Sequence, residues 1–217
     1  MLGVIQTKGK YVALDLSACD MTGVSNSGEF DPGTANTGEL LIVSLVLPGT
    51  AVSINAGGRN SLIFRFFTSL RNASGTGVLD IGSFTFTSCK SLEVVNFPLA
   101  ETIGDAAFQD CTALKTVDLP AAKTIDFFAF GYCGLLAEVS LPVAETIGDA
   151  AFGYCAVLVE VDLPAAENID PWAFIYCTSL KTVNLPKAET IGNNAFQGCP
   201  ATVSYPEGME FPVYVVS

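Results

Sequence analysis

Hydrophobic and polar residues recur along most of this chain with a period of 22 residues. A cysteine marks each repeat, with a phenylalanine three positions before it. In five repeats the cysteine is followed by a leucine, a valine and an apolar residue that directly precedes a proline. So many columns in one register indicate a repeat architecture. The cysteine column is Cys89, Cys111, Cys133, Cys155, Cys177 and Cys199.

Each repeat predicts one strand and one return segment. The consensus is C-x-x-L-x-x-V-x-L-P-x-A-x-x-I-G-x-x-A-F-x-x. Its L-x-x-V-x-L part alternates as a strand with one buried face does, and the proline, which lacks a backbone donor, ends it. The I-G-D-A-A-F part suits one helical or 3₁₀ turn capped by Asp105 or Asp149. The glycine column, with Asp126 and Asp170 in alternate repeats, predicts a left-handed backbone conformation there.

The pattern continues upstream in a degraded form. Phe64, Phe67, Leu70 and Ala73 match the phenylalanine, cysteine, leucine and valine columns. Longer spacings hold insertions, which include residues 23–38 and Gly57-Gly58. We therefore expect eight strands, with patterns that start at residues 11, 42, 70, 92, 114, 136, 158 and 180. A shortened final coil follows at residues 203–206, and the tail that ends with residues 213–216 covers the open end.

Stacked coils bury one continuous core, so we expect a single solenoid domain over residues 1–217. Its expected parts are an N-terminal cap with the first strand at 1–39, irregular repeats at 40–85, regular repeats at 86–199 and a C-terminal cap at 200–217.

The repeat resembles the BspA-type (Treponema pallidum) subclass of leucine-rich repeats. The stretch G-K-Y-V-A-L-D-L-S-A-C at residues 9–19 also resembles the N-terminal cap of treponemal members, and the resemblance extends over residues 9–206. It implies an α/β fold: a right-handed leucine-rich-repeat solenoid with a parallel sheet on its concave face and short helical or 3₁₀ turns on its convex side. It also implies a surface-associated or secreted bacterial protein that binds host proteins, although no residue motif defines a ligand.

Charge and composition narrow the classes of partner. A net charge of −12 argues against nucleic acid and against an acidic membrane surface, and it favours a basic partner or a cation. No apolar run reaches the roughly 18 residues of a membrane span. Residues 1–6 make no signal peptide, because Lys8 and Lys10 follow the apolar stretch instead of preceding it. The lack of histidine excludes His triads, His-ligated zinc and His general bases, and we expect no cofactor.

The cysteine column is a candidate for soft-metal binding or disulfides. Neighbours in a ladder project in parallel, so four thiols do not converge tetrahedrally on zinc, and disulfides need Cβ atoms that approach each other. Buried free thiols, which behave as small hydrophobic groups, are therefore the preferred interpretation. Phe67 in the same column agrees with it, and Cys19, outside the column, is expected to react differently.

The strand positions that point away from the core form the first candidate binding surface. Asp118, Glu138, Glu160 and Asp162 place four carboxylates on three successive strands, which costs stability and favours a basic partner or a cation. A merely solvated acidic face is the alternative. A carboxylate-dependent hydrolase is remote, because no nucleophile or base motif lies nearby. The full set of candidates is Val94, Asn96, Thr116, Asp118, Glu138, Ser140, Glu160, Asp162, Thr182 and Asn184.

Aromatic residues of the return segment form the second candidate surface. In one column large and small residues alternate, so that each ring can lie over a small neighbour. That column is Phe84, Ala106, Phe128, Ala150, Trp172 and Asn194. With Phe128 and Trp172, the tyrosines Tyr132, Tyr154 and Tyr176 form either an exposed patch for self-association or an outer packing layer, which is the favoured interpretation.

The sequence thus predicts a non-enzymatic scaffold without catalytic residues that binds a protein, such as a host extracellular or cell-surface protein. A self-associating structural protein is the alternative.

Overall fold

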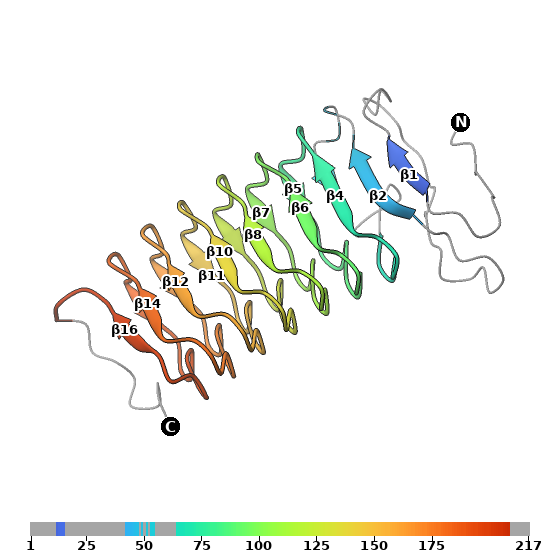
Figure 1. Ribbon diagram of the computed structural model, residues 1–217. Helices are drawn as coiled ribbons and strands as arrows, with labels where there is room; N and C mark the ends of the chain where they lie inside the picture. Colours follow the sequence, from blue (N-terminus) through green and yellow to red (C-terminus); the bar gives the residue numbers. More distant parts are fainter. Residues whose placement is uncertain are drawn as a thin grey trace.

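The computed structural model describes residues 12–15, 42–47, 49, 51, 53–54 and 64–208. The expectations for Tyr11, Cys19, residues 23–38, Gly57-Gly58 and residues 213–216 lie outside these residues. Within them the chain winds into coils that stack along one axis, with β1 and β16 at opposite ends (Figure 1).

The first row of strands follows the predicted L-x-x-V-x-L pattern, and every paired neighbour in it is parallel. All eight expected strands are present. A ninth, β16, pairs with β14 through Thr202 and Thr182, which are 20 residues apart, so the final coil is shortened as predicted. The row consists of β1 (Val12–Asp15), β2 (Ile42–Leu47), β4 (Asn72–Gly75), β6 (Val94–Asn96), β8 (Thr116–Asp118), β10 (Glu138–Ser140), β12 (Glu160–Asp162), β14 (Thr182–Asn184) and β16 (Thr202–Ser204).

A second row of two-residue strands forms a seven-stranded parallel sheet that the repeat pattern did not predict. Most of these strands are a Thr-Ile pair directly before the glycine column, and β-branched residues favour strands. That recurring pair was the available signal. The row consists of β3 (Ser53–Ile54), β5 (Asp80–Ile81), β7 (Thr102–Ile103), β9 (Thr124–Ile125), β11 (Thr146–Ile147), β13 (Asn168–Ile169) and β15 (Thr190–Ile191).

The return segment is a series of turns. No α-helix or 3₁₀-helix occurs in the described part of the chain, so the expected helical turn is not confirmed. The N–H of Ala107 closes a turn on the carbonyl of Gly104 at 3.1 Å, whereas the N–H of Phe108 donates to Ala129 of the next coil at 2.8 Å. Because alternate donors serve the neighbouring coil, they are not free to form a helical ladder.

The prediction of a left-handed backbone at the glycine column was wrong. Positive φ angles occur two and six residues later, as at Ala106 (50°) and Asp110 (59°). The glycines serve close approach between coils instead: a Cβ on Gly104 would stand 2.8 Å from the backbone nitrogen of Ser83. The non-glycine residues with positive φ are Phe66, Phe84, Ser88, Ala106, Asp110, Phe128, Tyr132, Ala150, Tyr154, Trp172, Tyr176 and Asn194.

A stack of phenylalanine rings runs through the core. Neighbouring ring centroids are 5.2–5.4 Å apart and the planes are inclined by only 3–14°. The degraded coil joins this stack, because Phe64 lies on Phe86 and Ala73 pairs with Val95. Its assignment to the repeat is therefore confirmed. The rings belong to Phe64, Phe86, Phe108, Phe130, Phe152, Phe174 and Phe196, all buried.

Removal of one ring from this stack tests its contribution. We expect Phe130→Ala to lower the free energy of unfolding by about 3–5 kcal/mol, because it opens a cavity between two stacked neighbours. Phe127→Ala, in the same coil but with a side chain that is 50% exposed, is the matched control and should cost about 1 kcal/mol or less. Denaturant-induced unfolding measures both, and equal losses would contradict the stack's role.

Candidate functional site

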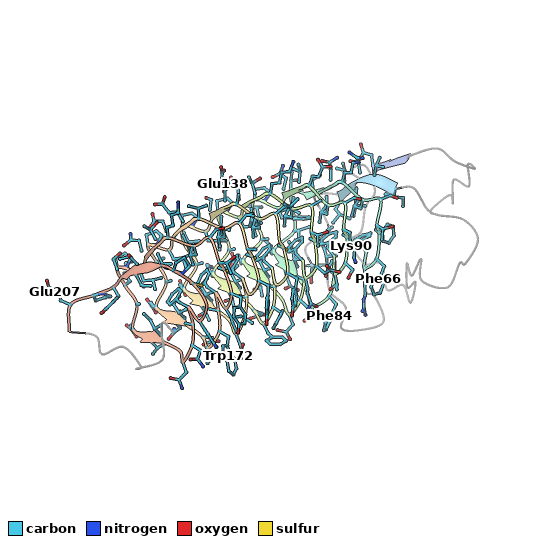
Figure 2. All side chains as sticks on the ribbon, turned by 60° about the horizontal axis from the view of Figure 1, so that its bottom comes forward. Phe66, Phe84, Lys90, Glu138, Trp172 and Glu207 are labelled. Atoms are coloured by element: carbon cyan, nitrogen blue, oxygen red, sulfur yellow. The ribbon has the colours of Figure 1, made fainter. Side chains whose placement is uncertain are left out.

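The exposed side chains of the first strand row form one face, called here the first-sheet face. In β6, β8, β12 and β14 the two outer residues are exposed and the middle one is buried; β10 differs only in that Val139 is half-buried. All ten predicted face residues are exposed. Figure 2 places Glu138 along the edge of the molecule opposite Phe84 and Trp172.

The four carboxylates of this face lie together but do not converge. Glu138 and Glu160 occupy the same position in neighbouring coils, across a break in the sheet between β10 and β12. A second break separates β6 from β8, where no like charges meet, so repulsion alone does not account for the breaks. Within the described residues, no group of three histidine, cysteine, aspartate or glutamate residues is placed to hold a metal ion.

Asp162 has partners of its own on this face. The Nδ2 of Asn184 donates to its Oδ1 at 2.8 Å, and the Oγ of Ser204 donates to the Oδ1 of Asn184 at 3.0 Å. Asp118, by contrast, lies opposite Ser140 in the β8–β10 register. The part of the acidic face outside this hydrogen-bond network therefore comprises Asp118, Glu138 and Glu160.

The cysteine column is a ladder of free, buried thiols, which confirms the preferred interpretation. Each Sγ donates a hydrogen bond of 2.9–3.3 Å to the carbonyl of the phenylalanine one coil earlier, as Cys133 does to Phe108. Burial raises the pKa of Cys89 and Cys155 to about 12. Because the thiolate is the reactive form, these side chains are structural.

Exposed aromatic rings line the return segment and form a turn ridge. It comprises Phe66, Phe84, Phe127, Phe128, Tyr132, Tyr154, Trp172 and Tyr176. Tyr132 stacks on Tyr154 with centroids 4.5 Å apart, and Phe128 stacks on Tyr132 at 5.8 Å. Except for the half-buried Phe128 and Tyr154, these residues are 42–52% exposed. The ridge is therefore both a packed layer and an exposed aromatic surface.

A row of acidic side chains beside the second strand row was not singled out as a site by sequence reasoning. Burial, then the charges of Asp105 and Asp80, raises the pKa of Asp126. Burial, then the charge of Asp170, raises the pKa of Asp149. The expected caps at Asp105 and Asp149 are not confirmed, because the described residues contain no helix to cap.

The fold and these surfaces define a parallel β-solenoid of about six regular leucine-rich coils of about 22 residues. The model of the BspA-type leucine-rich repeat region matches residues 75–203 in six copies. The chain belongs to this family.

Several solved structures share the fold. A leucine-rich cell surface protein of Faecalibacterium prausnitzii is 26% identical, with a TM-score of 0.65 over 75% of this chain and 48% of its own. A leucine-rich repeat protein of Bacteroides ovatus is 25% identical, with a TM-score of 0.54 over 77% of this chain and 55% of its own. The chain thus spans about half the length of each. The T. pallidum leucine-rich repeat protein is also similar, at 23% identity over 73% of this chain and 77% of its own, with a TM-score of 0.46.

No curated protein matches the chain. A search for membrane-spanning helices among the described residues finds no candidate.

The burial of the thiols predicts how fast they react with a disulfide reagent. In native protein at pH 8 we expect the six column cysteines to react with a disulfide reagent far more slowly than in unfolded protein, because all six are buried and because burial raises the pKa of thiols such as Cys89 and Cys155. Cys19→Ser removes the seventh cysteine, which lies outside the column. Six rapidly reacting thiols in the native variant would show that the ladder is accessible.

Removal of one carboxylate from the acidic row beside the second strand row should stabilise the protein in a pH-dependent way. The raised pKa of Asp126 means that its carboxylate destabilises the folded chain at neutral pH. The penalty fades as the pH falls through the folded pKa towards the ordinary value of 3.8. We expect Asp126→Asn to raise the free energy of unfolding at pH 7, and this gain should shrink near pH 4. Asp149→Asn should behave in the same way, and a gain that does not change with pH would contradict the assignment.

Proposed function

We propose that the protein is a non-enzymatic scaffold whose first-sheet face docks a basic surface of a partner protein. The observation that carries this proposal is the set of ten exposed side chains on five neighbouring strands of one rigid stack. Solenoids present such extended surfaces to their partners, because buried columns and backbone pairing hold the coils together without needing the exposed side chains of the face. We further propose that this face is the concave one, that the solenoid is right-handed and that residues 1–39 and 200–217 cap a single domain.

The distribution of charge supports a basic partner. Between Lys123 and Lys181 the chain contains no lysine or arginine. The carboxylates in this stretch have no cation within it, apart from the interaction of Glu145 with Lys123 at its border, and their net negative field attracts positive surfaces. They are Asp126, Glu138, Glu145, Asp149, Glu160, Asp162, Glu167 and Asp170.

We propose further that the protein acts at a bacterial surface, where its partner is a host extracellular or cell-surface protein. The support is the family itself and the F. prausnitzii relative, which is described as a cell surface protein. Adhesion is the activity that a rigid binding scaffold would serve in that place.

Self-association through Tyr132, Tyr154, Tyr176, Phe128 and Trp172 is the second candidate. The exposure of the turn ridge favours it. The net charge of −12 opposes it, because two copies repel each other. Sedimentation velocity over a range of concentrations separates the two, since a strict monomer at high concentration excludes self-association.

Charge reversal of the first-sheet face tests the leading proposal. We expect the combined variant Asp118→Lys, Glu138→Lys, Glu160→Lys and Asp162→Lys to capture at least about tenfold less protein from solubilised host extracellular matrix, since like charges repel across an interface. The matched control reverses four exposed carboxylates off this face, by Glu145→Lys, Glu167→Lys, Glu189→Lys and Glu207→Lys. Equal capture by both variants and the wild type would exclude the first-sheet face.

A further inference from the structure

One end of the turn ridge already holds a cation. The guanidinium of Arg65 lies over the ring of Phe66, 4.6 Å from its centroid, and 5.8 Å from the centroid of Phe84. Both distances lie within the range in which a guanidinium is attracted by the negative face of an aromatic ring. The ridge therefore contains, within the chain itself, an example of how its rings bind an arginine side chain.

The alternation of large and small residues separates further rings of this column from one another. Phe84, Phe128 and Trp172 follow each other at every second coil, with the buried Ala106 and Ala150 between them. Coils are 5.2–5.3 Å apart in this part of the phenylalanine stack, so these positions are separated by about twice that spacing. A planar group that stacks at about 3.5–4 Å on each side needs less room than this. Phe128 is half-buried and packs against Phe127 and Tyr132, so the exposed ring of Trp172, with the small Ala150 one coil before it, is the one that a guanidinium can reach.

The charges beside the rings complete this arrangement. Asp126 lies two residues before Phe128, and Asp170 lies two residues before Trp172. Asp149 interacts with Asp170 electrostatically, and these carboxylates belong to the stretch between Lys123 and Lys181 that contains no cation. At this end of the ridge the carboxylates are close to the rings in the sequence, and among the described residues no arginine side chain lies over Phe128 or Trp172.

We propose that the turn ridge around Phe128 and Trp172 is a second binding surface, which takes arginine side chains of a partner protein. The planar guanidinium stacks on the ring and its N–H groups donate to the neighbouring aspartates, whereas a lysine ammonium offers only a point charge. Trp172 is on the opposite edge of the solenoid from Glu138 (Figure 2). Binding at this surface can therefore be tested independently of binding at the first-sheet face.

A second copy of the chain is a poor source of these arginines. The chain has three arginines. Arg65 already lies over its own rings, and Arg71 pairs with Glu93 at 3.3 Å. Arg59 lies outside the described residues. Both described arginines are thus engaged within the chain, and we assign the site to a different protein that carries an exposed arginine-rich segment.

The single tryptophan makes this site directly observable. The full chain is titrated with an octa-arginine peptide and with an octa-lysine peptide, while the emission of Trp172 and its quenching by acrylamide are measured. We expect the arginine peptide to bind more tightly, to change the emission and to protect Trp172 from acrylamide. Equal affinity for both peptides, or an emission that stays the same at saturation, would overturn the proposal.

Variants of Trp172, followed by the anisotropy of labelled peptides, test the role of the ring. Trp172→Ala should weaken binding of octa-arginine by about fivefold, as expected for one cation–π contact of about 1 kcal/mol, and should abolish the preference for arginine over lysine. Trp172→Phe keeps a ring and should restore most of that preference. Thermal unfolding of each variant verifies that it is folded. If Trp172→Ala does not fold, Trp172→Phe alone still tests the preference for the arginine peptide.

A variant of the other face distinguishes this site from general charge attraction. Asp118→Asn, Glu138→Gln, Glu160→Gln and Asp162→Asn together remove charge from the first-sheet face and leave the ridge intact. This variant should keep the preference for arginine and the response of Trp172. Loss of the preference here, or a dimer in sedimentation that Trp172→Ala disrupts, would show that the ridge does not select arginine from a partner.

Discussion

The register of each coil on the next is the constraint on which the whole structure depends. It is held at the core by the thiol of one coil, which donates to the phenylalanine carbonyl of the coil before, and by rings stacked at 5.2–5.4 Å. Once this step is set, every other column is also placed one above the next. The register tolerates a change in coil length, because the coil that leads to β16 is two residues shorter after Cys199 and its strand still pairs in parallel with β14.

The same constraint explains the return segment. Its alternate N–H groups are used between coils, as in the bond from Tyr132 to Gly153 at 2.8 Å, and the remaining ones close turns. The backbone meets both demands by a left-handed φ at two positions in each coil, including Tyr132 and Trp172. Bulky residues adopt such angles only where the surroundings hold them, at a cost of about 1–3 kcal/mol each. A backbone set by stacking thus presents aromatic rings to solvent.

How much of the structure could be predicted from the sequence depends on whether a feature is set within one coil or by contacts between coils. The strands and their exposed residues, such as Glu138, were predictable because the alternation of side chains in a strand is local. The buried state of Cys133 was predictable because a ladder of parallel thiols has few other uses. The turns were not predicted, because hydrogen bonds between coils leave no period of their own in the sequence, and the second strand row left only a recurring two-residue pair that is too short to indicate a strand by alternation. Gly104 was assigned the wrong role because a glycine can serve a left-handed angle or a close approach, and only the position of Ser83 separates the two.

The two candidate surfaces share one property, which is that both lie outside the buried columns of the core. Glu138 and Glu160 face each other across a break in the sheet, and Asp126 is held next to other carboxylates. Such contacts lower stability, and the stacked core tolerates them because its own contacts are apolar and repeat in every coil. Residues 124–180 combine this tolerated negative charge with the exposed rings of the turn ridge. A positively charged partner would offset the repulsion, so the electrostatic cost in the free chain becomes binding energy in the complex.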